Sequence, residues 1–130
     1  ISASKQKTLN ISKPLVTPKA VALQMDFVVP KENAEAFEKV YYSIYVPAMT
    51  VQKGYRSSKL LRLFPEPLAK EIQAEPSTHN YQVQISFATE QDRRNWVKSK
   101  EHQIAWPAAS GLATSYKWRG YDVMGEDDQH

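Results

Sequence analysis

The chain of 130 residues has the length of one domain, and it can bury about two thirds of its unfolded surface without a disulfide or a structural metal. It has no cysteine, which excludes disulfides, thiol catalysis and thiolate metal sites. The formal net charge is only +3, and the apolar runs are short and interrupted by charge, so the sequence predicts no membrane span and no partner on a membrane.

The two ends of the chain differ in charge from its body. Residues 1–19 are rich in Ser, Thr, Lys and Pro and have no period, so we predict an irregular basic leader. Nucleic-acid binding needs a clustered basic face, so the leader favours a solvated arm over a nucleic-acid partner. Residues 125–130 form an acidic tail. Because the chain begins at Ile1 and lacks cysteine, a cytoplasmic location and an exported one, after removal of a signal peptide, fit equally well.

Regular structure begins at residue 20. From Val21 to Val29 apolar residues alternate with mainly polar ones, and this period of two predicts a strand with one apolar face. After Pro30 the apolar residues follow helical spacing, and Pro47 predicts that this helix ends near Val46.

The middle of the chain predicts two more strands. Gly54 marks a turn into a strand over 55–64, and residues 65–78 read as a long loop that holds one helical turn. Residues 79–89 alternate again and predict the third strand.

A second helical region follows the third strand. Thr89, with Asp92 three residues later, resembles a capping box, and the helix that it opens is expected to carry Trp96 and Val97 inward and Arg93 outward. An irregular helical stretch over 101–113 is interrupted by a proline and a glycine, and residues 115–124 form the fourth strand.

This order predicts an α+β domain over residues 20–124, with a ferredoxin-like β-α-β-β-α-β topology and an antiparallel sheet covered by helices on one face. The first and third strands are then the central pair. Their second face carries small, mostly polar side chains, which include Gln24, Asp26, Gln82, Gln84 and Ser86. This face is either exposed to solvent or packed against a second sheet, and amides suit the second alternative because they pair without burying charge.

Three segments resemble the dimeric α/β barrels of the antibiotic-biosynthesis-monooxygenase-like family. They are NWVKSKEHQIAW at 95–106, the opening strand and helix VALQMDFVVPKENAEAFEKVY at 21–41, and VPAMTVQKGYRSSKLLR at 46–62. The resemblance covers about residues 20–124. It implies a homodimer whose two sheets close into a barrel, and a small pocket between the sheet and the helices of each subunit.

The family includes cofactor-independent oxygenases of polyketide-derived phenols, quinol oxygenases and haem-degrading enzymes. In the haem-degrading branch, an Asn on the first strand accompanies a Trp on the second helix and a His about ten residues after it. This chain has Trp96, but Met25 and Trp106 stand at the other two positions. Haem degradation is therefore not the expected activity.

His102 is the first candidate for catalysis. It follows Trp96 by six residues, where relatives often carry His, and its imidazole titrates near neutral pH and can take a phenolic proton. The alternative is a structural His at a break between helices. Asp26 is a second catalytic candidate, as an orienter of His102 or of a substrate hydroxyl, or else an ordinary interface carboxylate.

The expected binding residues are mostly aromatic. Trp96, Trp106 and Trp118 would line an aromatic-ligand pocket or simply fill the core, Gln24 and Gln84 would offer polar contacts, and Tyr41 would donate to an oxyanion or pack in its helix. The three histidines lack metal-ligand spacing, and no glycine-rich phosphate loop occurs, so we expect no metal and no tightly held cofactor. The sequence thus favours a cofactor-independent monooxygenase-like protein for a small phenol or quinol. The alternative is a non-catalytic barrel that binds a small ligand or serves as an interaction module.

Overall fold

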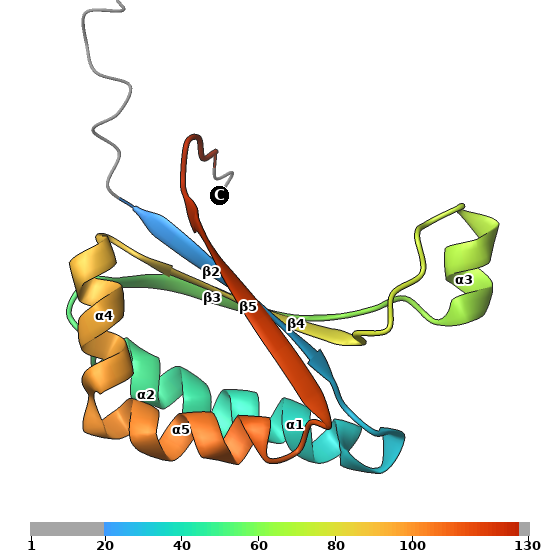
Figure 1. The fold of residues 1–130 in the computed structure, drawn as a ribbon, viewed down its shortest axis with the longest axis horizontal. Helices are drawn as coiled ribbons and strands as arrows, with labels where there is room; N and C mark the ends of the chain where they lie inside the picture. Colours follow the sequence, from blue (N-terminus) through green and yellow to red (C-terminus); the bar gives the residue numbers. More distant parts are fainter. Residues whose placement is uncertain (1–19, 128–130) are drawn as a thin grey trace, which may run out of the picture.

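The computed structural model describes residues 20–127, which form one antiparallel sheet with helices on one side (Figure 1). Its strands are β2 (Val21–Val28), β3 (Tyr55–Arg62), β4 (Tyr81–Phe87) and β5 (Ser115–Asp122), in the order β3-β4-β2-β5. Two helical regions connect them in a β-α-β-β-α-β sequence. The predicted ferredoxin-like α+β fold is confirmed, with β2 and β4 as the central pair.

The register of the sheet follows from the alternation in β2. Leu23 pairs with Ile85 and Met25 with Val83, so the apolar residues of both central strands face the same side. The core lies between this side and the helices, and its largest fully buried side chains are Trp96, Phe27, Phe37, Phe87, Met49 and Ile85. Among residues 20–127 the opposite side of the sheet carries no helix (Figure 1).

The first helical region is longer than the sequence predicts. It contains η1 (Lys31–Asn33), α1 (Ala34–Val40), η2 (Tyr41–Tyr45) and α2 (Val46–Thr50), so the expected end near Val46 is wrong. The segment η2 is a π-helix, in which the Val46 N–H reaches back five residues to the Tyr41 carbonyl. This wider turn lets the helix continue past Pro47, which has no N–H to donate.

The second helical region contains α4 (Glu90–Lys98) and α5 (Lys100–Ser110). The Thr89 hydroxyl accepts from the Asp92 N–H, as the capping prediction requires, and Ser99 caps α5 in the same way through the His102 N–H. The two helices thus meet at Ser99, and α5 keeps Pro107 within it.

Gly54 holds the turn between α2 and β3 at a backbone angle that only glycine adopts readily. Its φ is +82°, and a Cβ atom there would lie 2.1 Å from a carboxylate oxygen of Asp92. The turn at Gly54 therefore packs directly against the start of α4.

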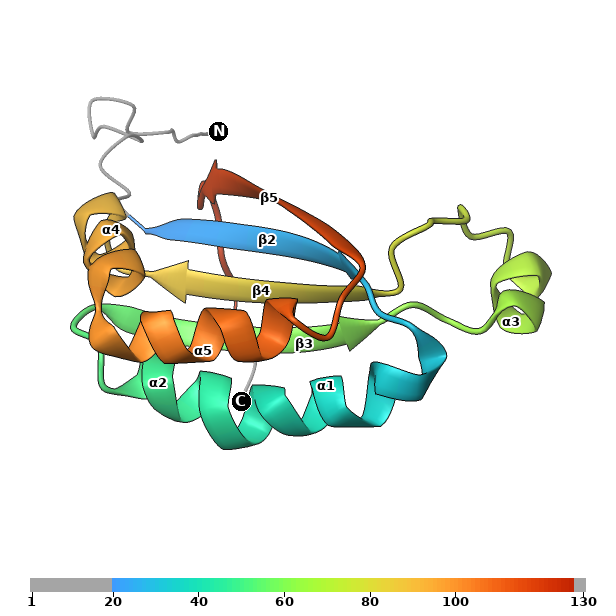
Figure 2. The same ribbon diagram turned by 60° about the horizontal axis from the view of Figure 1, so that its bottom comes forward.

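The long β3–β4 connection carries the expected short helix, α3 (Glu66–Glu71), and projects from the end of the sheet (Figures 1 and 2). Between residues 20 and 127 no helix is both long and apolar enough to cross a membrane. The predicted leader, residues 1–19, and the last three residues of the predicted acidic tail lie outside the described part of the chain.

Candidate functional site

A pocket of about 320 Å³ lies between the apolar face of the sheet and the helices α4 and α5. The helices contribute Arg93, Trp96, Val97, His102 and Trp106, the strands β2 and β5 contribute Leu23, Met25, Tyr116 and Trp118, and η2 contributes Tyr45. It lies between sheet and helices, where the resemblance to the barrel family predicts a pocket.

Helical spacing aims the side chains of α4 and α5 at this pocket. Arg93 and Trp96 are three residues apart on α4, and His102 and Trp106 are four apart on α5, so each pair shares one helix face. The Ser99 cap fixes the start of α5 three residues before His102. The position of His102 is therefore set by the joint between the two helices.

His102 lies between two tryptophans. The Trp96 ring meets it edge to face with ring centroids 4.9 Å apart, and the Trp106 ring is parallel to it at 6.2 Å. Tyr116 extends this aromatic row, with its ring 5.0 Å from that of Trp106. A planar aromatic ligand would find stacking surfaces on several sides here.

Burial changes the protonation of His102. The side chain is half-buried, and the loss of hydration lowers the pKa of its imidazole below the ordinary value. The neutral ring, which can accept a proton, therefore dominates at pH 7. Tyr45, buried against Trp96, has a pKa raised by burial and stays a neutral phenol.

The polar candidates on the strands lie on the other side of the sheet. Gln24 pairs in register with Gln84, and Asp26 with Gln82, whose amide donates to the Asp26 carboxylate over 2.8 Å. Arg119 approaches the same carboxylate to 3.6 Å. Because Met25, the neighbour of Asp26, faces the pocket, Asp26 cannot orient His102 within one chain.

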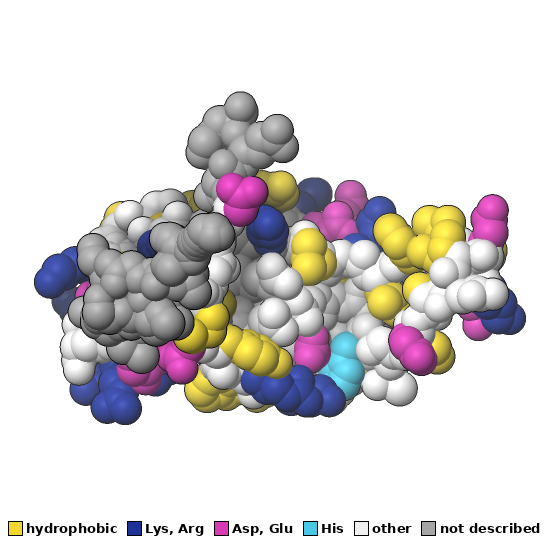
Figure 3. Space-filling view, turned by 90° about the horizontal axis from the view of Figure 1, so that it is seen from above, with side chains coloured by type: hydrophobic (Ala, Val, Ile, Leu, Met, Phe, Trp, Pro, Cys, Tyr) yellow, Lys and Arg dark blue, Asp and Glu magenta, His cyan; other side chains and the backbone are white. Residues whose placement is uncertain are grey.

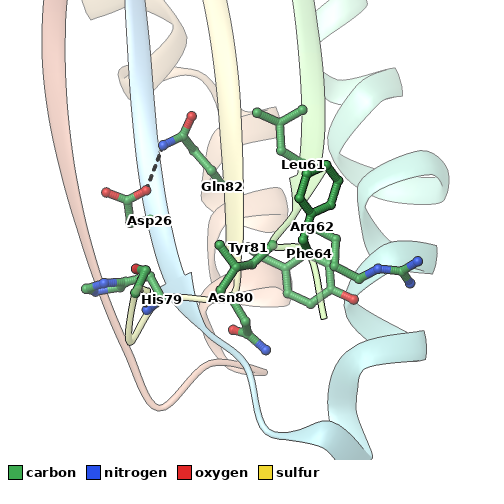
Figure 4. Close-up of a pocket in the computed structure, with 10 residues that line it drawn as sticks. Asp26, Leu61, Arg62, Phe64, His79, Asn80, Tyr81 and Gln82 are labelled. Carbon is green, nitrogen blue, oxygen red and sulfur yellow. Dashed lines mark hydrogen bonds between the residues drawn. The ribbon is translucent and has the colours of Figure 1, made fainter. Parts of the chain in front are cut away.

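The open face, meaning the sheet face opposite the helices, is seen in Figure 3. Uncharged polar side chains and backbone, drawn white, fill its middle, and hydrophobic side chains gather toward α3. A depression of about 470 Å³ at that end includes Asp26, Phe64, His79 and Gln82 (Figure 4). It contains no stacked pair of rings, and its carboxylate is already held by Gln82.

Tyr41 lies at neither of these places. Its hydroxyl is 2.6 Å from that of Ser58 on β3, and Tyr55 donates to the same serine. Burial raises the pKa of Tyr41, and the hydrogen bond with Ser58 acts in the opposite direction. The structure therefore does not bring Tyr41 together with His102.

The structure adds pocket residues that the sequence reasoning places elsewhere or does not single out. The sequence predicts that Arg93 points outward, yet its side chain is only 16% exposed and lines the pocket. Its spacing of three from Trp96 is the signal for this position, since polarity alone suggests a solvated residue. Tyr116 is two residues before Trp118 on β5 and therefore shares its face.

Within residues 20–127 no group of three His, Asp or Glu side chains lies together in a way that would bind a metal ion. The pocket itself offers one imidazole and one guanidinium among aromatic and aliphatic side chains.

No family model matches the sequence, and no curated protein does. The fold does match solved structures. The cofactor-independent oxygenase SnoaB from Streptomyces nogalater is 16% identical with a TM-score of 0.60, over 86% of this chain and 96% of that one. A candidate antibiotic biosynthesis monooxygenase from Caulobacter crescentus is 14% identical with a TM-score of 0.63, over 82% and 91%.

The fold also occurs in an enzyme of another class. The hydroxynitrile lyase of Passiflora edulis is 9% identical with a TM-score of 0.68, over 86% of this chain and 99% of that one. Fold alone therefore does not fix the reaction. The predicted resemblance is confirmed in structure, and the chain has the ferredoxin-like fold of the antibiotic-biosynthesis-monooxygenase-like proteins.

Proposed function

We propose that the chain is a cofactor-independent monooxygenase-like protein that oxidises a small, electron-rich phenol or quinol in the pocket under α4 and α5. The observation that carries this proposal is a neutral, half-buried His102 between two tryptophan rings. A proton acceptor set among stacking surfaces suits a flat, acidic hydroxyl compound.

In the proposed reaction His102 takes the phenolic proton and the ring becomes an electron-rich anion. That anion supplies the electrons for the reaction with molecular oxygen. For a phenol oxidised to a quinone, one oxygen atom enters the ring, and the other leaves as water with two hydrogen atoms from the substrate. No electrons are needed from a cofactor in this balance.

Trp96 and Trp106 serve to hold the ring beside the base. Trp96 is 1% exposed and packed against Tyr45 and Phe87, so its indole forms a rigid wall. Such a wall reduces the freedom of the bound ring and keeps water from the anion, and both effects favour the reaction.

The open face supports a homodimer. Its central strands carry half-buried, mostly uncharged side chains such as Gln24 and Gln84, which can pair across an interface with little charge to desolvate. In this arrangement Asp26 and the two glutamines serve the contact between subunits. The second candidate function is a non-catalytic barrel that binds the same aromatic ligand, and the aromatic lining supports it equally.

Oxygen consumption tests the catalytic proposal. An oxygen electrode would follow the purified protein with a panel of phenols and quinols, together with His102→Ala and the matched control His79→Ala. His79 lies in the depression on the open face, so its loss leaves the pocket intact. We expect turnover with at least one compound, a loss of about 10²–10⁴-fold in His102→Ala, and no change in His79→Ala.

A thermal-shift measurement on the same panel separates the two candidate functions. Ligand at a hundred times its dissociation constant adds about 2.7 kcal/mol to stability. Stabilisation without oxygen uptake would favour the non-catalytic barrel, and turnover that survives in His102→Ala would contradict the assigned base.

A further inference from the structure

We propose that Arg93 is an anion-recognition residue of the pocket, and that the preferred ligand is a planar aromatic bearing a negatively charged group, such as a carboxylate, in addition to the hydroxyl that His102 deprotonates. This inference rests on the proposed function, because it concerns the ligand of the same pocket. It adds a prediction about the charge of the ligand, because the aromatic lining favours a planar ring but does not distinguish a charged ring from a neutral one.

Arg93 is the one positively charged side chain among the described residues that line this pocket. It lies on the same face of α4 as Trp96, and its guanidinium carbon is 5.7 Å from the ring centroid of Trp118. The cation and the aromatic surfaces therefore face one volume.

The guanidinium is oriented by Glu90. Its Nε and Nη2 donate to the two carboxylate oxygens of Glu90, each over 2.7 Å, in a bidentate arrangement. The Nη1 atom has no hydrogen-bond partner in the described part of the chain. A side chain that is only 16% exposed thus keeps donors free for a ligand.

The local charge balance leaves an excess of positive charge. Glu90 is shared by two arginines, since the Nε of Arg94 also donates to it over 3.0 Å. One carboxylate and two guanidinium groups leave one positive charge uncompensated within this cluster. Asp122 lines the adjoining depression, but no ion pair in the described residues joins it to Arg93.

The anion of an aromatic acid matches both features, with its ring among the tryptophans and its oxygens at the free guanidinium donors. A planar carboxylate also suits the fork of an arginine better than the point charge of a lysine. A neutral ring of the same shape would gain only the stacking.

Binding of a matched pair of probes tests the inference. Titration calorimetry would compare 2-naphthoate with 2-naphthamide, which share the ring and differ in charge. We expect the wild-type protein to bind the acid at least about tenfold more tightly, as a charge-assisted hydrogen bond allows. Arg93→Gln should remove this preference and leave naphthamide binding unchanged.

Arg94→Gln is the matched control. It removes the same charge and the same partner of Glu90, but Arg94 is 60% exposed and does not line the pocket. The preference for the acid should persist in Arg94→Gln. An equal loss of the preference for the acid in both variants would mean that the electrostatic field of the whole protein, and not contact with Arg93, attracts the anion. That result would overturn the inference.

The remaining outcomes separate this inference from the proposed function. Equal binding of both probes by the wild-type protein would overturn the role of Arg93 and leave the aromatic pocket intact. Binding of neither probe would contradict both. Should Arg93→Gln fail to fold, Arg93→Lys keeps the charge without the fork and is expected to retain part of the preference.

Discussion

The two faces of one sheet carry different chemistry in this protein. The face under the helices forms part of a pocket in which tryptophans surround a neutral His102. The open face instead presents glutamine amides and the Asp26 carboxylate, which hydrogen-bond to one another. The same strands build both faces, because neighbouring residues such as Met25 and Asp26 point in opposite directions. We therefore propose that one face binds the ligand and that the other forms the contact between subunits.

The largest expected effect on stability comes from removing Trp96, which forms one wall of the pocket. Trp96→Ala should lower the free energy of unfolding by about 3–5 kcal/mol, because it removes a fully buried indole. Urea denaturation measures this loss. Trp118→Ala, at a position 55% exposed, should cost much less, and equal losses at the two sites would remove the distinction between core wall and pocket rim.

The molar mass of the protein in solution tests whether the open face forms a dimer interface. We expect light scattering at micromolar concentration to give twice the chain mass of 14.8 kDa. Gln84→Arg should give the monomer, because it places an unpaired charge beside Lys59 in the centre of the proposed interface. Gln91→Arg, on the exposed side of α4, should leave the mass unchanged. A monomeric wild-type protein would contradict the assignment of this face.

Removing the cap at the start of α4 should have a moderate effect on the free energy of unfolding. Thr89→Ala removes the cap that accepts from the Asp92 N–H and should cost about 1 kcal/mol of unfolding free energy. Thr50→Ala, at the exposed end of α2, should change stability by less than about 0.5 kcal/mol. Similar losses in both variants would show that the cap does not fix α4.

The smallest effect is on the pH dependence of stability. The folded protein holds His102 with a lowered pKa, so the unfolded chain binds more protons in the acid range below the ordinary value of 6.5. The stabilising contribution is complete above 6.5 and declines as the pH falls toward the folded pKa. Denaturation at pH 5 and pH 7 should therefore show a smaller difference in His102→Gln than in the wild-type protein, and an equal difference in both would contradict the burial effect on His102.

Much of the fold follows from patterns within the sequence. The alternation from Val21 to Val29 fixes a strand and its buried face, and the Thr89 cap fixes the start of α4. The continuation of the first helix past Pro47 does not follow, because it depends on a π-turn that no local propensity indicates.

The site could be predicted only in part. His102 is expected from the resemblance to the barrel family and from its imidazole chemistry, and Trp96 and Trp106 are expected as aromatic residues; all three line one pocket. The alternation that puts Asp26 on the polar face already separates it from helix-borne His102, so the idea that Asp26 orients His102 conflicts with the predicted topology. The spacing of three residues between Arg93 and Trp96 places both on one face of α4, but the contact of Arg93 with Trp118 does not follow from the sequence, because it arises only from tertiary packing.

The ligand is proposed to bind on the sheet face under the helices. A crystal of the protein grown with a brominated phenol would locate the ligand by the anomalous signal of bromine. We predict that the bromine lies in the pocket lined by Trp96, His102 and Trp106. A bromine on the open face, in the depression beside Asp26 and His79, would contradict the account.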